Sequence, residues 1–231
     1  CDHVIRLGMT MLEPGAGRGV GENASGMLPA DAKETDSVVA AIERRIGELV
    51  AIPPHADEDE LNLVFRPEPE SVEAHAAAEA LVNLHIDARL GRPYSAATVL
   101  VYLNDVECGG GTVFPCVDRT EDVRGAFARA FDSGRDFLEP AAPNSSAEDG
   151  RLLAVAEEMA RGQTQSGLVT KPMRGCAVVF WTFNPTGPSD QPWGSWSCEK
   201  LAWHGGVRVF PGGRGKWLLQ KFKELPLDLR A

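Results

Sequence analysis

Val82-Asn83-Leu84-His85-Ile86-Asp87 is the stretch of sequence that decides the fold. Apolar and polar residues alternate along it, and a period of two is typical of a β-strand with one buried face. Because residues i and i+2 of a strand project from the same face, His85 and Asp87 should point to one side. A helix would separate these two side chains by about 200°. The expected apolar face is Val82, Leu84 and Ile86, and the expected polar face is Asn83, His85 and Asp87.

His204 is the third member of a candidate metal site. Two imidazoles and one carboxylate can occupy one face of an Fe(II) ion and leave the opposite face open for further ligands. The pair His85 and Asp87 alone is a weak signal, because a surface strand can carry such a pair for solubility. His204 alone could equally be an ordinary core histidine. The sequence around these three residues is therefore needed to distinguish a metal site from a polar surface.

Composition places the chain among ordinary globular proteins. It has 231 residues, 43% of them hydrophobic and 24% charged, which suits a single soluble domain with one substantial core. No run of about 18 apolar residues offers a membrane span. The net charge of -10, from 23 basic and 33 acidic residues, disfavours binding to a phosphate backbone, so nucleic acid is not an expected partner.

The five cysteines assign no compartment, because they cannot all pair within one chain and none lies in a Cys-x-x-Cys zinc spacing. Since the first residue is Cys1 instead of Met, we expect a fragment or a processed form from which an upstream targeting segment is missing. A basic cluster near the C-terminus should either be a solvated strand edge or attract an acidic small molecule. Its members are Arg208, Arg214, Lys216, Lys221 and Lys223.

Helix and loop signals dominate the first third of the chain. Residues 13–30 are rich in Gly, Pro and Ala and predict a loop. The apolar spacing over 37–50 behind Asp36 predicts an amphipathic helix that packs against a sheet. Residues 61–65 predict a short strand, and the Ala-rich stretch 71–81 predicts a second helix.

Strand signals dominate the rest. Several antiparallel strands with few intervening helices predict a mainly β domain built as a closed or double-sheet barrel. Residues 117–168 interrupt this pattern with mixed charge and a short helix near 151–161, and we expect an insertion that is either a mobile cover over the site or partly disordered. The whole chain, 1–231, is then one catalytic domain. The predicted strands lie within 98–104, 177–183, 207–210 and 217–222.

Four blocks of sequence follow His85 and Asp87 in a diagnostic order. The order resembles the prolyl 4-hydroxylase alpha-subunit-like branch of the 2-oxoglutarate- and Fe(II)-dependent dioxygenases, over about residues 35–225. In that family His-x-Asp precedes a strand of the type Thr-x-Leu-x-Tyr-Leu-Asn-Asp-Val, a Gly-Gly-Glu-Thr-x-Phe-Pro turn, a Pro-x-x-Gly strand and a distal histidine. The blocks here are Thr98-Val99-Leu100-Val101-Tyr102-Leu103-Asn104-Asp105-Val106, Gly109-Gly110-Gly111-Thr112-Val113-Phe114-Pro115, Lys171-Pro172-Met173-Arg174-Gly175-Cys176-Ala177-Val178-Val179-Phe180-Trp181, and His204-Gly205-Gly206-Val207 with Gly215-Lys216-Trp217.

The resemblance implies a fold and a set of site residues. The fold would be a double-stranded β-helix, or jelly roll, with flanking N-terminal α-helices. His85, Asp87 and His204 would be the catalytic residues that hold Fe(II). Lys216 would pair with the far carboxylate of 2-oxoglutarate, since a buried dicarboxylate needs a cation to offset its desolvation. Tyr102 and Thr112 would donate hydroxyl hydrogen bonds to the same carboxylate.

The resemblance also implies a reaction. A procollagen-proline 4-dioxygenase-like enzyme would use Fe(II), 2-oxoglutarate, O2 and ascorbate (vitamin C) to hydroxylate a C–H bond, releasing succinate and CO2. The expected substrate is a peptidyl proline in a proline-rich peptide or protein. Since halogenating relatives lack the ligand carboxylate, Asp87 favours hydroxylation. The endoplasmic reticulum or secretory pathway is compatible with the resemblance.

Departures from the family pattern fall where a peptide substrate would lie. Family members usually have tyrosines and a glycine before His-x-Asp, whereas this chain has Phe65-Arg66-Pro67-Glu68-Pro69. Ser95 stands in place of a family arginine, and Gly111 in place of a glutamate. Two alternatives therefore stay open: an oxygenase acting on a non-prolyl substrate, and a catalytically silent binding module of the same fold. A zinc hydrolase with the same ligands would not explain Lys216.

Overall fold

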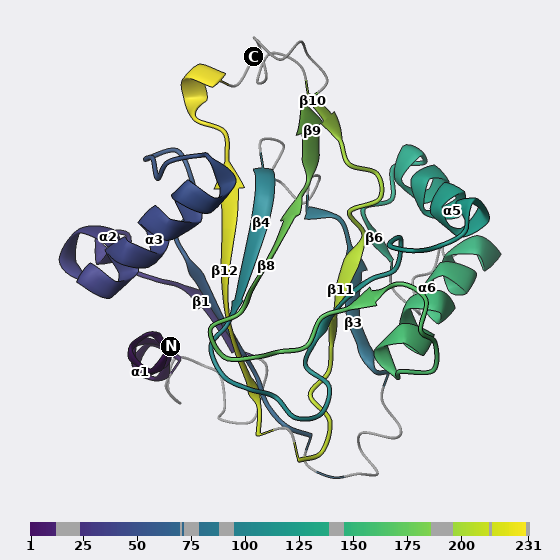
Figure 1. Ribbon diagram of the computed structural model, residues 1–231, viewed down its shortest axis with the longest axis horizontal. Coiled ribbons are helices and arrows are strands. Elements are labelled where there is room, and N and C mark those ends of the chain that lie inside the picture. The colour runs from purple at the N-terminus through teal and green to yellow at the C-terminus, as the bar shows by residue number, and fades with distance from the viewer. Residues whose placement is uncertain are drawn as a thin grey trace.

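The computed structural model describes residues 1–12, 24–69, 71, 79–87, 95–138, 146–185, 196–212 and 214–229. The molecule is mainly β, with two five-stranded antiparallel sheets and helices on the outer face of each (Figure 1). No helix among the described residues is long and apolar enough to cross a membrane.

The first sheet has the strand order β1-β2-β12-β4-β8 and is covered by the N-terminal helices (Figure 1). A cluster of buried apolar side chains, including Val39, Ile46 and Leu219, fills the space between these helices and the sheet. The strands are β1 (Ala24–Met27), β2 (Asn62–Arg66), β4 (Ser95–Tyr102), β8 (Ala177–Trp181) and β12 (Lys216–Glu224), and the helices are α1 (Asp2–Met11), α2 (Ala32–Thr35) and α3 (Ser37–Val50).

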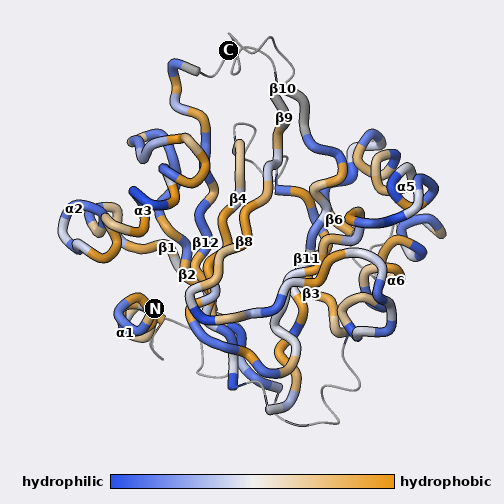
Figure 2. Tube along the Cα trace, in the orientation of Figure 1, coloured by the Kyte–Doolittle hydropathy of each residue, from blue (hydrophilic) through white to orange (hydrophobic). Residues whose placement is uncertain are grey.

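The second sheet has the order β6-β3-β11-β5-β7, and two helices cover its outer face. Phe127, Leu152 and Trp203 belong to the apolar cluster between those helices and the sheet. Figure 2 shows the helices with hydrophilic and hydrophobic positions in alternation, as expected for helices with one buried face. The elements are β3 (Leu81–His85), β5 (Thr112–Phe114), α5 (Glu121–Asp132), β6 (Phe137–Leu138), α6 (Ala147–Ala160), β7 (Leu168–Val169) and β11 (His204–Val207).

A third apolar cluster lies between the two sheets. Val64, Leu100, Tyr102 and Leu218 form it, and partly buried Phe180 packs against it. All of these residues come from the first sheet, so the inner side of that sheet is apolar at one end. Outside the sheets, a short antiparallel ladder joins β9 (Phe183–Pro185) to β10 (Trp196–Cys198), and a 3-10 turn covers Leu227–Leu229.

The helix predicted over 37–50 is confirmed as α3. The Asp36 carboxylate accepts hydrogen bonds from the backbone N–H groups of Val38 (2.8 Å) and Val39 (3.1 Å), which satisfies two donors that an uncapped helix would leave free. Val39, Ile46 and Val50 lie on its buried face. The expected packing of this helix on a sheet is therefore also confirmed.

Strand β3 departs from the predicted alternation at Asn83, whose backbone has a positive φ of 55°. His204 pairs with His85 and Gly206 pairs with Val82, so β3 has one residue more than β11 across this interval, which is a β-bulge. The extra residue turns Val82 onto the cavity side with His85, while Leu84 and Ile86 stay in the core. The predicted apolar face is thus wrong at Val82, because the bulge changes its direction.

The strand predicted over 82–87 is also too long at its C-terminal end, since β3 ends at His85. Beyond it, the Ile86 N–H donates to the carbonyl of Asp136 at 2.9 Å, outside the regular ladder. Ile86 itself is fully buried. Burial of this one side chain keeps Asp87 on the side of His85 without a continuing strand.

Other sequence predictions need correction. Part of the loop predicted over 13–30 is strand β1, whose residues Ala-Ser-Gly-Met carry too little hydrophobic alternation to signal a strand. The helix predicted over 71–81 falls mostly outside the described residues, and its last residue, Leu81, begins β3 instead. The strand β1 gave no sequence signal because Gly and Ala are depleted in strands.

The insertion predicted over 117–168 is neither a cover over the site nor disordered where it is described. Helices α5 and α6 pack against the outer face of the second sheet, away from the space between the sheets (Figure 1). Helix α6 begins with a capping box, in which Ser146 and Asp149 each bond the other's backbone N–H. The short helix expected near 151–161 is this element, with bounds Ala147–Ala160.

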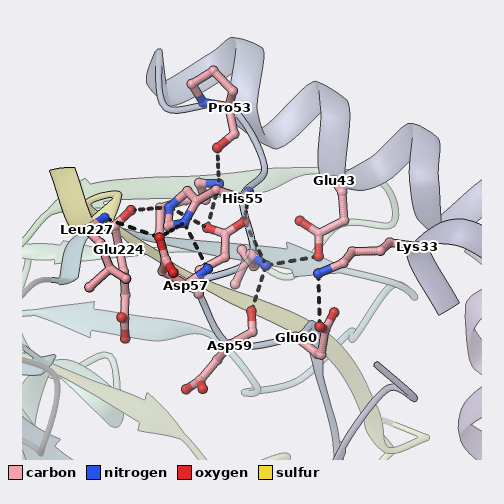
Figure 3. A network of polar contacts seen from close by, with 12 residues as sticks. Lys33, Glu43, Pro53, His55, Asp57, Asp59, Glu60, Glu224 and Leu227 are labelled. Carbon is pink, nitrogen blue, oxygen red and sulfur yellow. Dashed lines mark hydrogen bonds and ion pairs between the residues drawn. The ribbon is translucent and has the colours of Figure 1, made fainter. Parts of the chain in front are cut away.

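The prediction of a solvated strand edge is wrong for three members of the C-terminal basic cluster, because Lys216, Lys221 and Lys223 are buried, while Arg214 is exposed. Lys221 and Lys223 are buried beneath α3, where the Lys221 ammonium lies 3.0 Å from the Glu43 carboxylate and that of Lys223 lies 2.6 Å from Glu58. Carbonyl oxygens of Asp59 and Pro53 accept further hydrogen bonds from the two ammonium groups. Figure 3 shows this ionic network between α3, the following loop and β12. Lys221 and Lys223, two positions apart, therefore lie on one face of β12, where each has a buried carboxylate partner.

Candidate metal centre

Backbone pairing brings together two histidines that lie far apart in the sequence. His204 begins β11 and is the direct antiparallel partner of His85 at the end of β3. Side chains of such a pair share one face of a sheet. Their rings lie with centroids 4.3 Å apart, and both point toward the space between the sheets.

Asp87 completes a compact group of three donors. One carboxylate oxygen lies 3.3 Å from Nε2 of His85 and the other lies 3.6 Å from Nε2 of His204. One potential ligand atom from each residue lies within 4.8 Å of the other two. Among the described residues, this is the one group of three such side chains that could hold a metal ion.

Both imidazoles are held in the orientation that a metal ligand needs. Nδ1 of His85 lies 3.0 Å from the carbonyl oxygen of Asn83, and Nδ1 of His204 lies 3.0 Å from that of Ala202. A carbonyl can only accept, so each Nδ1 carries a proton and Nε2 is the nitrogen that can bind a metal ion. Both Nε2 atoms face Asp87. The hydrogen bonds that orient metal-binding histidines in proteins have this form.

The protonation states of Asp87 and His204 suit a cation, whereas at His85 the Asp87 carboxylate outweighs burial and raises the pKa of the imidazole. Burial opposes the charge of Asp87, but the imidazoles and a hydrogen bond from Thr98 outweigh it and hold the pKa of Asp87 well below its usual range. Burial lowers the pKa of His204 to about 4. Near neutral pH the group therefore offers an ionised carboxylate and a neutral ring at His204.

Thr98 is a supporting residue that the sequence did not single out. It lies on β4, in the opposite sheet, and its hydroxyl donates to the Asp87 carboxylate at 2.6 Å. This bond fixes Oδ2, the carboxylate oxygen that also faces His204. Phe180 packs at a centroid distance of 4.5 Å on the His204 ring, and Phe114 at 5.9 Å. These aromatic contacts restrict the orientation of the His204 ring, whose tautomer is already set by the hydrogen bond to Ala202.

Gly205 is needed for the bulged pairing. A Cβ at this position would lie 2.8 Å from the carbonyl oxygen of Asn83 and 2.9 Å from the Leu81 side chain. A real Cβ does not approach backbone oxygen this closely, so any other residue would push β11 away from β3. Glycine after His204 therefore belongs to the geometry that sets the two histidines side by side.

A cavity of about 100 Å³ opens next to the three donors. Lys216, at the start of β12, lines it and is 4% exposed. Burial, assisted by the charge of Arg66, lowers the pKa of Lys216 to about 7. No hydrogen bond or ion pair joins its ammonium to any described residue. Further lining residues include Val64, Val82, Thr112, Leu218 and Gln220.

Thr112 lines the cavity, whereas Tyr102 lies behind its wall. The Tyr102 hydroxyl is 2.9 Å from the Thr112 hydroxyl and 2.6 Å from that of Thr170. Tyr102 is fully buried, and burial raises the pKa of its hydroxyl. In this arrangement Tyr102 orients Thr112. Whether either hydroxyl contacts a ligand stays a prediction.

The structure thus brings His85, Asp87, His204, Lys216 and Thr112 to one cavity and places Tyr102 one layer behind it. Sequence reading missed Arg66, Thr98 and Thr170. The even spacing of Thr98 from Tyr102 places both on one strand face and could have marked Thr98 as a site residue. Arg66 gave no such signal, since its strand is short and ends at a proline.

Comparison with known proteins gives one informative similarity. No family model matches the chain. Prolyl 4-hydroxylase 1 of Arabidopsis thaliana is 27% identical over 220 residues, which cover 92% of this chain and 59% of the relative. The chain therefore spans about three-fifths of the length of this curated relative.

Solved structures give weaker similarities. A prolyl-4-hydroxylase from Pseudomonas putida aligns with a TM-score of 0.41 and 14% identity over 97% of this chain and 83% of that one. The non-heme iron oxygenase OrfP, in complex with Fe, aligns with a TM-score of 0.29 and 13% identity over 66% of this chain and 54% of that one. At these scores neither alignment adds to the argument. By sequence, this chain is therefore similar to a prolyl 4-hydroxylase over most of its length.

Proposed function

We propose that this chain is an Fe(II)- and 2-oxoglutarate-dependent dioxygenase that hydroxylates a C–H bond. The observation that carries the proposal is the convergence of His85, Asp87 and His204, with both Nε2 atoms facing the carboxylate, on a cavity that holds the buried cation Lys216. Two imidazoles and a carboxylate suit Fe(II), whereas all-oxygen donor sets suit Mg²⁺ and Ca²⁺.

Lys216 distinguishes this proposal from zinc hydrolysis. The same three ligands could hold zinc, but a hydrolase has no need for a buried cation that faces the metal cavity without a counter-ion among the described residues. A dicarboxylate would supply that counter-ion. In the proposed complex the distal carboxylate of 2-oxoglutarate accepts from Lys216 and from the Thr112 hydroxyl, which Tyr102 and Thr170 hold in place.

The protein's own contribution is binding, orientation and exclusion of water. When bound, the iron supplies the oxidation that ordinary side chains cannot perform. Leu218, Leu100 and Val64 give the cavity apolar walls. Such walls strengthen the charge pairing at Lys216 and keep bulk water from the reacting atoms. The overall reaction takes 2-oxoglutarate, O2 and a C–H bond to succinate, CO2 and an alcohol, with ascorbate as a supporting reductant.

The proposed substrate is a peptidyl proline, by analogy with the curated relative, and a non-prolyl C–H bond is the alternative. Of the departures between Phe65 and Pro69, Arg66 lines the cavity, which is the reason to keep the alternative. We further propose that the two sheets form a double-stranded β-helix and that residues 1–231 make one catalytic domain, with 117–168 as an insertion.

Anaerobic binding tests the proposal directly. Adding 2-oxoglutarate to the Fe(II)-loaded protein should produce the charge-transfer absorption band of a metal-bound 2-keto acid. His204→Ala should lose both iron and the band. His3→Ala, which removes an imidazole on α1 that contacts Asp36, should keep both. An iron stoichiometry near one in His204→Ala would contradict the ligand assignment, and iron binding without the band would contradict 2-oxoglutarate as co-substrate.

A further inference from the structure

Arg66 and Lys216 form a pair of like charges on the cavity side of the first sheet. Lys216 is the direct antiparallel partner of Arg66 in the ladder between β12 and β2. Both residues line the cavity, together with Val64 and Leu218 from the same strand faces. Like charges placed opposite each other on one face destabilise a sheet, and more so when they are buried.

The arginine has little in the fold to compensate its charge. Nη1 of Arg66 donates to the carbonyl oxygen of Phe65 at 3.1 Å, and among the described residues no carboxylate forms an ion pair with its guanidinium. Burial lowers the pKa of Arg66. The titratable residues that line the cavity are Arg66, His85, Asp87, His204 and Lys216.

The anionic member of that set cannot neutralise the pair. Asp87 faces His85 and His204 and accepts a hydrogen bond from Thr98, so its charge is already engaged at the metal end. The cavity therefore has an anionic end, suited to a metal ion, and a basic end formed by Arg66 and Lys216. A ligand that fills it should carry negative charge at the end away from the metal.

We propose that Arg66 is a second binding residue for the distal carboxylate of the 2-keto acid co-substrate, and that it makes the site selective for dicarboxylates. The inference rests on the proposed function. Arg66 presents a planar fork that can take both oxygens of a carboxylate, while Lys216 adds a point charge beside it. Binding of the carboxylate between them turns a repulsive pair into two attractive ones.

The experiment compares two ligands that differ at one end. 2-Oxopentanoate keeps the 1-carboxylate and 2-keto group of 2-oxoglutarate but has a methyl group in place of the distal carboxylate. Dissociation constants for both are measured by calorimetry on Fe(II)-loaded protein without oxygen. The variants are Arg66→Gln, Arg66→Lys and Lys216→Gln. Arg44→Gln is the matched control, because it removes an arginine from an exposed pair with Glu48 on α3.

Arg66→Gln should weaken 2-oxoglutarate binding about tenfold or more, as expected for loss of a charged hydrogen-bond pair, and change 2-oxopentanoate binding less than about twofold. Arg66→Lys should recover part of the loss, since it keeps the charge without the fork. Lys216→Gln should behave like Arg66→Gln, and Arg44→Gln like the wild type.

Three results would overturn the inference, and each is distinct. If Arg66→Gln binds 2-oxoglutarate as the wild type does while Lys216→Gln does not, Arg66 has no role and the proposed function stands. If Arg66→Gln weakens both ligands equally, the residue acts through the fold and not on the distal carboxylate. If the wild-type protein binds neither ligand, the proposed function fails together with the inference.

Discussion

Thr98 sets the direction of Asp87 from the sheet opposite the two histidines. Its hydroxyl donates to the carboxylate at 2.6 Å, and both side chains are buried. Hydrogen bonds of this kind hold a ligand in place before the metal arrives, and their loss usually costs about 10–100-fold in metal affinity.

Thr98→Val should therefore weaken Fe(II) binding about 10–100-fold while the protein stays folded, because valine has nearly the same shape. Competition with a metal-binding dye measures the affinity. Thr182→Val is the control, since it removes the hydroxyl of another buried threonine, one that bonds the Ser95 carbonyl away from the metal ligands. Equal iron affinity in Thr98→Val and the wild type would contradict the role of this hydrogen bond.

If 2-oxoglutarate binds as proposed, Lys216 should make its affinity depend on pH. Its pKa is about 7 in the free protein, so at pH 8 most molecules carry a neutral amine. A carboxylate partner favours the charged form and raises this pKa, so binding at pH 8 takes up a proton. Above pH 7 the affinity for 2-oxoglutarate should fall, by up to about tenfold per pH unit, until the pKa of the complex is reached.

Calorimetry in two buffers of different ionisation enthalpy measures this proton. We expect an uptake approaching one proton at pH 8 in the wild type and about none in Lys216→Met, which also binds more weakly. The same small uptake in both proteins would mean that Lys216 is already charged before the ligand binds.

Among single residues, the sequence predicted the candidate metal ligands and Lys216 better than the residues that hold them in place. His85, Asp87, His204 and Lys216 carry chemistry that a motif can specify. Arg66 and Thr170 reach the site through pairings between strands distant in sequence, β2 with β12 and β5 with β7, and no local pattern encodes such pairings.

The ionic network between α3 and β12 joins elements that are far apart in the sequence. Glu58 lies in the loop after α3 and is 7% exposed, and it contacts both Lys221 at 3.3 Å and Lys223 at 2.6 Å. Removing one member of a buried pair leaves an uncompensated charge, which costs more than the intact pair contributes. The network therefore matters for the position of β12, whose first residue is Lys216.

Glu58→Gln should lower the free energy of unfolding by about 3–5 kcal/mol, because two buried ammonium groups lose their shared carboxylate. Urea denaturation followed by fluorescence measures the change. Arg44→Ala, which breaks the exposed pair with Glu48, should cost less than about 0.5 kcal/mol. A similar small loss in both variants would show that the Glu58 contacts are replaced by water.

Elements with a strong hydrophobic period were predictable, and those shaped by long-range contacts were not. The strands expected over 98–104, 177–183 and 217–222 correspond to β4, β8 and β12, and the helix over 37–50 is α3. The bulge at Asn83 was not predictable, because it arises from the register against β11. The burial of Lys221 and Lys223 on β12 was not predictable, since charge alternation alone does not reveal a helix packed above the strand.

Across the whole molecule, two sheets with helices on their outer faces leave one space between them for chemistry. The candidate metal ligands come from β3, β11 and the residues directly after β3, all in or next to the second sheet. Lys216, Arg66 and Thr98 come from the first sheet. The site therefore depends on how the two sheets face each other. The sequence predicted a mainly β molecule with N-terminal helices, and the structure agrees, but the place of α5 and α6 on the outer face followed from no sequence signal.

Succinate formation tests the central claim most directly. The measurement is conversion of 2-oxoglutarate to succinate by the whole chain with Fe(II), ascorbate and O2, with and without a panel of proline-rich and proline-free peptides. We predict turnover that requires iron, is abolished in His204→Ala, and rises with at least one proline-rich peptide. No succinate, with or without peptide, from protein shown to contain iron would contradict the proposed dioxygenase.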